Sequence, residues 1–88
     1  MYKIELRRSV ERILQKLSRK DPKQLGIILR KIEEIQAGPH HYKNLRKPLQ
    51  HLKRVHIDSS FVLVFSVNEV EKTVIIEDYD HHDRIYKT

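Results

Sequence analysis

The sequence predicts an α+β fold, in which an N-terminal strand and a two-helix antiparallel hairpin precede a three-stranded antiparallel meander. The helices are expected to pack on one face of a four-stranded, mostly antiparallel sheet. Leu52 to Tyr86 holds nearly all the β-branched and aromatic residues of the second half, in runs separated by small or charged residues. Residues 10–35 instead repeat apolar side chains at helical spacing. The 88 residues predict one domain, 1–88.

Three apolar runs predict the meander. They lie at about 52–57, 61–67 and 73–79, and the sequences DSS and NEVEK between them are typical of turns. The second run is apolar on both faces. We therefore expect it to be the central strand, covered on both sides.

The first run is polar on one side. Strand alternation places Lys53, Val55 and Ile57 on one face and Arg54 and His56 on the other. One face of this strand is therefore expected to carry arginine and histidine beside the apolar central strand.

The N-terminal part predicts a strand and a helix. Residues 2–6 alternate apolar and charged side chains, which predicts a short strand, expected to join the sheet beside the central strand. Ser9 then precedes apolar residues at the spacing i, i+3, i+4, i+7, so we expect an amphipathic helix with Ser9 as its N-cap.

A second helix is predicted between two proline-containing pairs. Asp21 can cap the free amides beside Pro22, and Gln24 completes a capping-box spacing. Gly38 and Pro39 are expected to end the helix, the glycine in a left-handed conformation. The segment 39–51 predicts a basic loop.

The core is expected to draw on every predicted element. Its predicted members are Ile4, Leu14, Leu17, Leu25, Ile28, Ile32, Val55, Leu63, Phe65, Val74 and Ile76.

Composition narrows the class of protein. The chain has no cysteine, which excludes disulfides and zinc-thiolate sites. It has no apolar run of the ~20 residues that cross a bilayer and no signal-peptide core, so we expect a cytoplasmic protein without a membrane partner. The net charge of +6 favours a polyanion or an acidic protein as partner.

Basic and titratable groups are expected to converge around the meander. They are Arg46 and Lys47 before the first strand, Arg54 and His56 on it, and His81, His82 and Arg84 after the third. Such a cluster suits cleavage of RNA, because the 2′-hydroxyl of the RNA is the nucleophile and the protein supplies proton transfer and positive charge. No metal or cofactor is required. Adjacent histidines on extended chain point opposite ways, which argues against metal ligation at His40-His41 or His81-His82-Asp83.

Two stretches resemble RelE-type toxins. KPLQHLKRVHIDSSFVLVF resembles the loop and basic strand of that family, and DYDHHDRIY resembles its terminal element. With the N-terminal strand and helical hairpin, the resemblance covers nearly the whole chain. It implies the toxin of a bacterial or archaeal toxin–antitoxin pair, a metal-independent endoribonuclease that cuts mRNA in the ribosomal A site. The implied partners are an antitoxin encoded by a neighbouring gene, the ribosome and mRNA.

The resemblance also implies site residues. The catalytic set is Arg54, His56, His82 and Tyr86, and the RNA-binding set is Lys43, Arg46, Lys47, Lys53, His81 and Arg84. Three positions depart from the family pattern: Val62 and His82 stand where arginines are usual, and Asp80 where a glycine is usual.

A second interpretation stays open. ParE-like relatives share this architecture and act on DNA gyrase, so the chain could be a gyrase poison. It could also be an inactive toxin relic that acts as a binding module with its antitoxin. Because positions 62 and 82 lack the arginines that are usual in RelE-type toxins, the gyrase poison and the inactive relic both stay open as alternatives.

Overall fold

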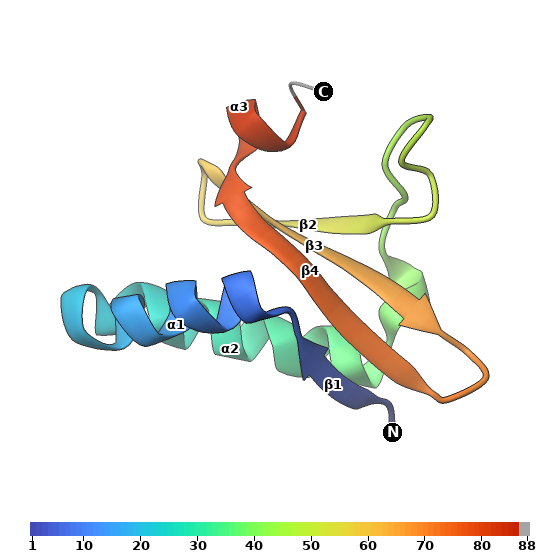
Figure 1. Ribbon diagram of the computed structural model, residues 1–88, viewed down its shortest axis with the longest axis horizontal. Helices are drawn as coiled ribbons and strands as arrows, with labels where there is room; N and C mark the ends of the chain where they lie inside the picture. The colour runs from blue at the N-terminus through green and yellow to red at the C-terminus, as the bar shows by residue number, and fades with distance from the viewer. Residues whose placement is uncertain (87–88) are drawn as a thin grey trace.

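The computed structural model describes residues 1–86, which form one mixed sheet with two long helices beside it (Figure 1). The elements in chain order are β1 (Lys3–Leu6), α1 (Arg8–Lys20), α2 (Pro22–Ala37), a 3-10 helix (Pro39–His41), β2 (Lys53–Ile57), β3 (Phe61–Asn68), β4 (Thr73–His81) and α3 (His82–Ile85). The predicted α+β class and element order are confirmed. No helix in residues 1–86 combines the length and apolar character of a membrane span.

The strand order is β1-β4-β3-β2. The meander pairs are antiparallel, and β1 runs parallel to β4. The predicted place of β1 beside the central strand is wrong, because β2 and β4 already pair with the two edges of β3. β1 pairs instead with the outer edge of β4, where Ile4 and Leu6 lie opposite Val74 and Ile76.

Of the two predicted N-caps, one is confirmed and one is wrong. The amide of Gln24 donates to Asp21 Oδ1 at 3.1 Å, which confirms the predicted cap of α2. Ser9 is not the N-cap of α1. The helix already begins at Arg8, because the amide of Arg7 is bound to the carbonyl of Ile76 and turns the chain directly from β1 into α1.

Gly38 ends α2 without the left-handed conformation that we expected. Its φ is −158°, and its amide bonds the carbonyls of Glu34 and Ile35. The reason for glycine here is space: a Cβ at position 38 would lie 2.8 Å from Nδ1 of His41.

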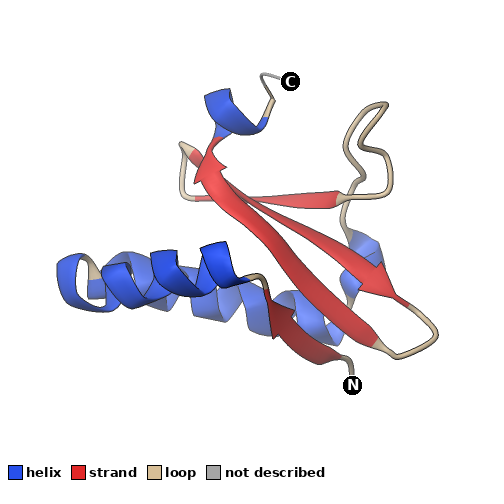
Figure 2. Ribbon diagram, in the orientation of Figure 1, coloured by secondary structure: helices blue, strands red, loops and turns tan. Residues whose placement is uncertain are grey.

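The main core lies between the two long helices and the sheet (Figure 2). Seven of the predicted core residues are buried there: Leu14, Ile28, Ile32, Leu63, Phe65, Val74 and Ile76. The other four, Ile4, Leu17, Leu25 and Val55, are partly buried at the margin of the same cluster. They lie nearer the edges of the layers, which a single-sequence pattern does not distinguish from the centre.

The opposite face of the sheet has a thinner cover. Leu45 is buried over Val62 and Val64 of β3, and the half-buried side chains of Leu49, Leu52 and Ile85 surround them. The central strand is therefore covered on both sides, as predicted. The cover on this face consists of the loop before β2 and the short helix α3, and the candidate site lies there.

Candidate active site

Arg54 and His56 share a face of the sheet with two buried valines. Arg54 lies opposite Val64 and His56 opposite Val62 in the pairing of β2 with β3. Residues directly opposite each other in an antiparallel pair project to the same face. Both valines belong to the thinly covered side, so the predicted arginine and histidine face of β2 is confirmed.

The loop before β2 is held against this face by its own backbone. The amide of Leu45 donates to the carbonyl of Leu52 at 2.8 Å, and the amide of Leu49 donates to the carbonyl of Arg46 at 2.9 Å. Buried Leu45 anchors the loop on the sheet. These contacts leave the side chains of Arg46 and Lys47 exposed beside β2.

The short helix α3 places Tyr86 over the same region. Ile85 packs against the cluster of Val62 and Val64, and the amide of Tyr86 donates to the carbonyl of His82 at 3.0 Å. The guanidinium carbon of Arg54 lies 5.8 Å from the centre of the Tyr86 ring, a cation–π contact. Tyr86 is nevertheless 46% exposed, so part of its ring is open to a ligand.

The loop, β2 and α3 enclose a cavity of about 550 Å³. Its lining residues are Asn44, Leu45, Arg46, Lys47, Pro48, Leu49, Arg54, His56, Ile85 and Tyr86. Three of them are arginine or lysine, and no carboxylate is among the described residues that line the cavity. The cavity therefore combines positive charge with one histidine and one aromatic ring, and it is within the size range of ligand sites.

A second, open cleft of about 520 Å³ lies at the end of β4. It is lined by Phe61, Asp80, His81, Asp83 and Arg84. His81 contacts the Phe61 ring edge-on, with 5.7 Å between ring centres. This cleft therefore takes His81 and Arg84 from the predicted RNA-binding set.

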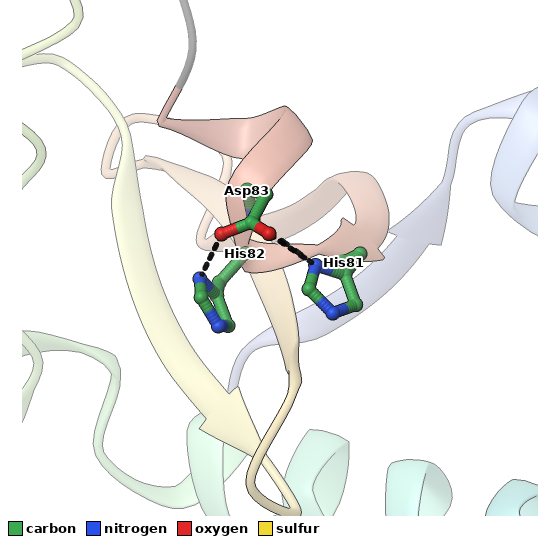
Figure 3. Close-up of side chains that lie close together, drawn as sticks. All are labelled: His81, His82 and Asp83. Carbon is green, nitrogen blue, oxygen red and sulfur yellow. Dashed lines mark hydrogen bonds and ion pairs between the residues drawn. The ribbon is translucent and has the colours of Figure 1, made fainter.

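His81 and His82 lie side by side, with ring centres 4.7 Å apart and an interplanar angle of 30°. Figure 3 shows the carboxylate of Asp83 facing both rings, 3.6 Å from His81 Nδ1 and 3.0 Å from His82 Nδ1. Our expectation that adjacent histidines point opposite ways is wrong here. The strand ends at His81 and α3 begins at His82, so the chain is not extended across the pair.

The structure thus gathers half of the predicted site residues. Arg46, Lys47, Arg54, His56 and Tyr86 line the first cavity. His82 is not among the described residues that line it, although it begins the helix that carries Tyr86.

Two predicted lysines stand apart from the cavity lining. Lys53 projects to the other face of β2, where its ammonium donates to the carbonyl of Tyr42 at 3.2 Å and to Asn44 Oδ1 at 3.0 Å. Lys43 is exposed, and its carbonyl accepts from the amide of Arg54. The sequence analysis did not predict the other residues that line the cavity, which are Asn44, Leu45, Pro48, Leu49 and Ile85.

No family model matches the sequence. The curated protein "Putative toxin RelE4" of Methanocaldococcus jannaschii is 64% identical over 87 residues, which cover 99% of this chain and 93% of that protein. The chain belongs to the RelE superfamily of toxins. An uncharacterised protein of Methanosarcina mazei is 55% identical over 98% of this chain and 100% of its own length. The resemblance to RelE-type toxins is confirmed.

Solved structures of RelE-superfamily toxins share the fold. A YoeB/ParE toxin from Agrobacterium tumefaciens superposes with a TM-score of 0.81 at 14% identity, over 91% of this chain and 98% of that one. The RelBE2 toxin–antitoxin complex from Mycobacterium tuberculosis gives a TM-score of 0.76 at 22% identity, over 91% of this chain and 96% of that one. At such low identity these likenesses show the fold alone.

Proposed function

We propose that this RelE-superfamily toxin is a ribosome-dependent endoribonuclease that cuts mRNA in the ribosomal A site. The observation that carries the proposal is the cavity that gathers Arg46, Lys47, Arg54, His56 and Tyr86. The cleaved strand of RNA supplies its own 2′-hydroxyl as nucleophile, so the protein needs to hold the phosphate, stabilise negative charge and transfer protons. The cleaved message then ends in a 2′,3′-cyclic phosphate.

The cavity supplies positive charge and a stacking surface. Arg54 is half-buried beneath Tyr86, so its guanidinium is held in place to stabilise the charge that develops on the phosphate. The exposed part of the Tyr86 ring can stack on a base. Arg46 and Lys47 are exposed at the rim, where they suit contacts with neighbouring phosphates.

Two histidines are suited to proton transfer. His56 is exposed at the edge of the cavity. Nδ1 of His82 lies 3.0 Å from a carboxylate oxygen of Asp83, a contact that orients the ring and leaves Nε2 to exchange a proton with RNA. Of the remaining predicted RNA-binding residues, Lys43, Lys53, His81 and Arg84 would act on the strand beyond the cavity.

We infer that an antitoxin neutralises this toxin. The structures similar to this fold include the YoeB–YefM complex from Staphylococcus aureus and a RelE–RelB complex from Pyrococcus horikoshii. The net charge of +6 suits an acidic segment of such a partner as well as RNA. Because its substrate is on the ribosome, the toxin would act in the cytoplasm.

The test maps cleavage of an mRNA on stalled ribosomes by primer extension, with toxin that has been treated with EDTA and then desalted, so that the ribosomes keep their Mg²⁺. We expect the treated toxin to cleave as fast as the untreated toxin. Arg54→Ala should slow it by roughly two to three orders of magnitude, the scale for losing one group that stabilises an oxyanion. Arg30→Ala, which removes an exposed arginine on α2, is the matched control and should leave the rate unchanged.

His82 is tested with two substitutions. His82→Ala should slow cleavage by about two orders of magnitude or more, and His82→Asn, which keeps a donor for Asp83 but cannot transfer a proton, should be as slow. If His82→Asn cleaved at a near-normal rate, His82 would not transfer a proton and would serve only as a positioning residue. Cleavage that is lost when the toxin alone has been treated with EDTA, or that survives Arg54→Ala unchanged, would contradict the proposed mechanism.

The alternative is a binding module, either a ParE-like gyrase poison or an inactive relic. One observation favours it: Val62, where RelE-type toxins usually have an arginine, is fully buried under the thin cover of the sheet. The site therefore lacks one cation that the family commonly supplies. A parent protein that binds an antitoxin but cuts no message on ribosomes would establish this alternative. Inhibition of gyrase supercoiling would then separate the poison from the relic.

A further inference from the structure

We propose that His81, His82 and Asp83 form a binding site for a divalent transition-metal ion, of which Zn²⁺ is the best-matched example. Two imidazoles and one carboxylate are ligands that Zn²⁺ accepts in proteins. The three donor atoms of this group already lie within 4.8 Å of one another. Figure 3 shows the three side chains converging from the end of β4 and the start of α3.

The spacing of the donors is close to that of a metal centre. The carboxylate oxygens of Asp83 lie 3.6 Å from His81 Nδ1 and 3.0 Å from His82 Nδ1. Ligands about 2.0–2.2 Å from a tetrahedral zinc ion are separated from one another by about 3.4 Å. Both contacts are near that separation but involve different carboxylate oxygens, so the three side chains would rotate to place one oxygen and both Nδ1 atoms around an ion.

The tautomer of His81 is suited to ligation. Its Nδ1 accepts a hydrogen bond from the amide of Asp83 at 3.2 Å, so Nδ1 carries a lone pair, and ligation would exchange this hydrogen bond for a bond to the ion. The proton of the neutral ring is then on Nε2. For His82, ligation through Nδ1 requires the neutral ring with its proton on Nε2, and the ion would then lie between Nδ1 and the carboxylate of Asp83.

The backbone beneath the group is well anchored. The amide of His82 donates to the carbonyl of Ser60 at 2.9 Å, which ties the start of α3 to the turn between β2 and β3. The ring of His81 rests against Phe61. The group is also accessible, because the side chains of His81 and His82 are 40% and 41% exposed. Asp80 lies in the same open cleft, but its Oδ1 is 3.6 Å from the guanidinium of Arg84, so we do not count it as a ligand.

A comparison within the chain supports this choice of site. Glu69 also contacts a histidine, His40, but Lys72 donates to the same carboxylate at 2.7 Å, and the hydroxyl of Tyr2 does so too. A fixed ammonium beside Glu69 opposes a second cation. Asp83 instead faces two imidazoles, which are neutral ligands when deprotonated.

Metal binding here has a consequence that rests on the proposed function. A bound ion takes the Nδ1 lone pair of His82 and replaces its contact with Asp83. The ring of His82 is then held at the ion and is no longer free to act on RNA. The metal therefore acts as a reversible inhibitor of a cleavage reaction that needs no metal.

The binding test is calorimetric titration of ZnCl₂ into the purified full-length chain, freed of metal beforehand, near neutral pH. We expect one ion per chain with a Kd on the order of micromolar. His82→Ala and Asp83→Asn should each weaken binding by at least about tenfold. His51→Ala, which removes an exposed histidine outside the group, should leave the affinity unchanged.

The location is read independently from amide and imidazole NMR signals during the same titration. Shifts centred on residues 81–83 support the site. Absence of saturable binding, shifts centred on other histidines, or equal weakening by His51→Ala would overturn it. Thermal unfolding of each variant without metal checks that the loss of affinity is not a loss of fold.

The inhibition test adds saturating Zn²⁺ to the ribosome cleavage assay. We expect at least tenfold slower cleavage, full recovery when EDTA is added, and no effect of Mg²⁺ at the same concentration, since Mg²⁺ prefers oxygen ligands. Zinc that binds without slowing cleavage would overturn the inhibitory role. A parent that never cleaves would overturn the proposed function, whereas the calorimetric and NMR results would still decide the metal site.

Discussion

The two faces of the sheet are covered in different ways. On one face, α1 and α2 bury side chains from the helices against β2, β3 and β4 in one large cluster. On the other, a loop and the short helix α3 cover Val62 and Val64 with one buried leucine and three half-buried residues. The first cavity is lined entirely from this second face. The helical face therefore stabilises the fold, whereas the thinner cover on the other face shapes the candidate site.

The largest expected effect comes from placing an arginine on each face. Val74 and Val62 are both fully buried, Val74 against the helices and Val62 beneath α3. Val74→Arg buries an unpaired charge, which costs about 3–5 kcal/mol, so we expect the chain to unfold. Val62→Arg can extend its guanidinium into the cavity if Ile85 moves aside. We therefore expect it to stay folded with α3 displaced.

Circular dichroism and thermal unfolding show whether each of the two variants is folded. NMR signals of the Ile85 methyl groups report on α3. A Val62→Arg protein as unfolded as Val74→Arg would show that the thin layer is as integral to the fold as the helical core.

An intermediate effect is expected from the apolar contact that seats α3. Ile85→Ala removes part of the cover of Val62 and Val64. Because Ile85 is only half-buried, we expect a loss of about 1–2 kcal/mol of unfolding free energy. Cleavage should fall by about tenfold or more, since Tyr86 would no longer be held over Arg54.

Leu29→Ala is the control for Ile85→Ala. Leu29 is 46% exposed on α2, away from the cavity, and its replacement should leave cleavage unchanged. Denaturant unfolding and the ribosome cleavage assay provide the two readouts. Equal losses of stability and activity in both variants would mean that α3 has no special role in the site.

The fold was largely predictable because its signals are local. The run FVLVF is apolar on both faces and is the central strand, and Asp21 and Gln24 form the predicted cap. The place of β1 was not predictable in this way, because it depends on which sheet edge remains free after the meander forms. The prediction of Ser9 as the N-cap was also wrong because of a contact distant in sequence. The amide of Arg7 bonds to the carbonyl of Ile76, and α1 begins before Ser9.

The candidate site was predictable to the extent that it follows strand alternation. Arg54 and His56 lie on the expected face, and the resemblance to RelE-type toxins anticipated Tyr86. The stacking of His81 and His82 was not predictable, because it depends on the change from strand to helix at residue 82. The meeting of the Tyr86 ring with Arg54 likewise depends on the half-buried Ile85 as an anchor.

The smallest expected effect concerns an ion pair at the edge of the sheet. Arg7 Nε donates to Glu77 Oε1 at 2.9 Å, and the hydroxyl of Ser66 donates to Glu77 Oε2 at 2.6 Å. Partial burial raises the pKa of Glu77, but the hydrogen bonds from Arg7 and Ser66 outweigh it, so the pKa is lowered below its usual value. This pair joins the start of α1 to β4 without contributing apolar area to either cluster.

A lowered pKa in the folded state means that Glu77 stabilises the fold when it is ionised. That stability is fully present above the unfolded pKa of about 4.3, and it is lost as the pH falls through the lower folded value. Glu77→Gln should therefore cost less than about 1 kcal/mol at neutral pH, because the Arg7 side chain is 56% exposed and the pair is screened by solvent. The difference in Tm between parent and variant should shrink as the pH falls below about 4. Glu33→Gln, an exposed position on α2, is the control. If the difference in Tm instead grew as the pH fell, the protonated carboxyl of Glu77, and not the ionised one, would be the form that stabilises the fold.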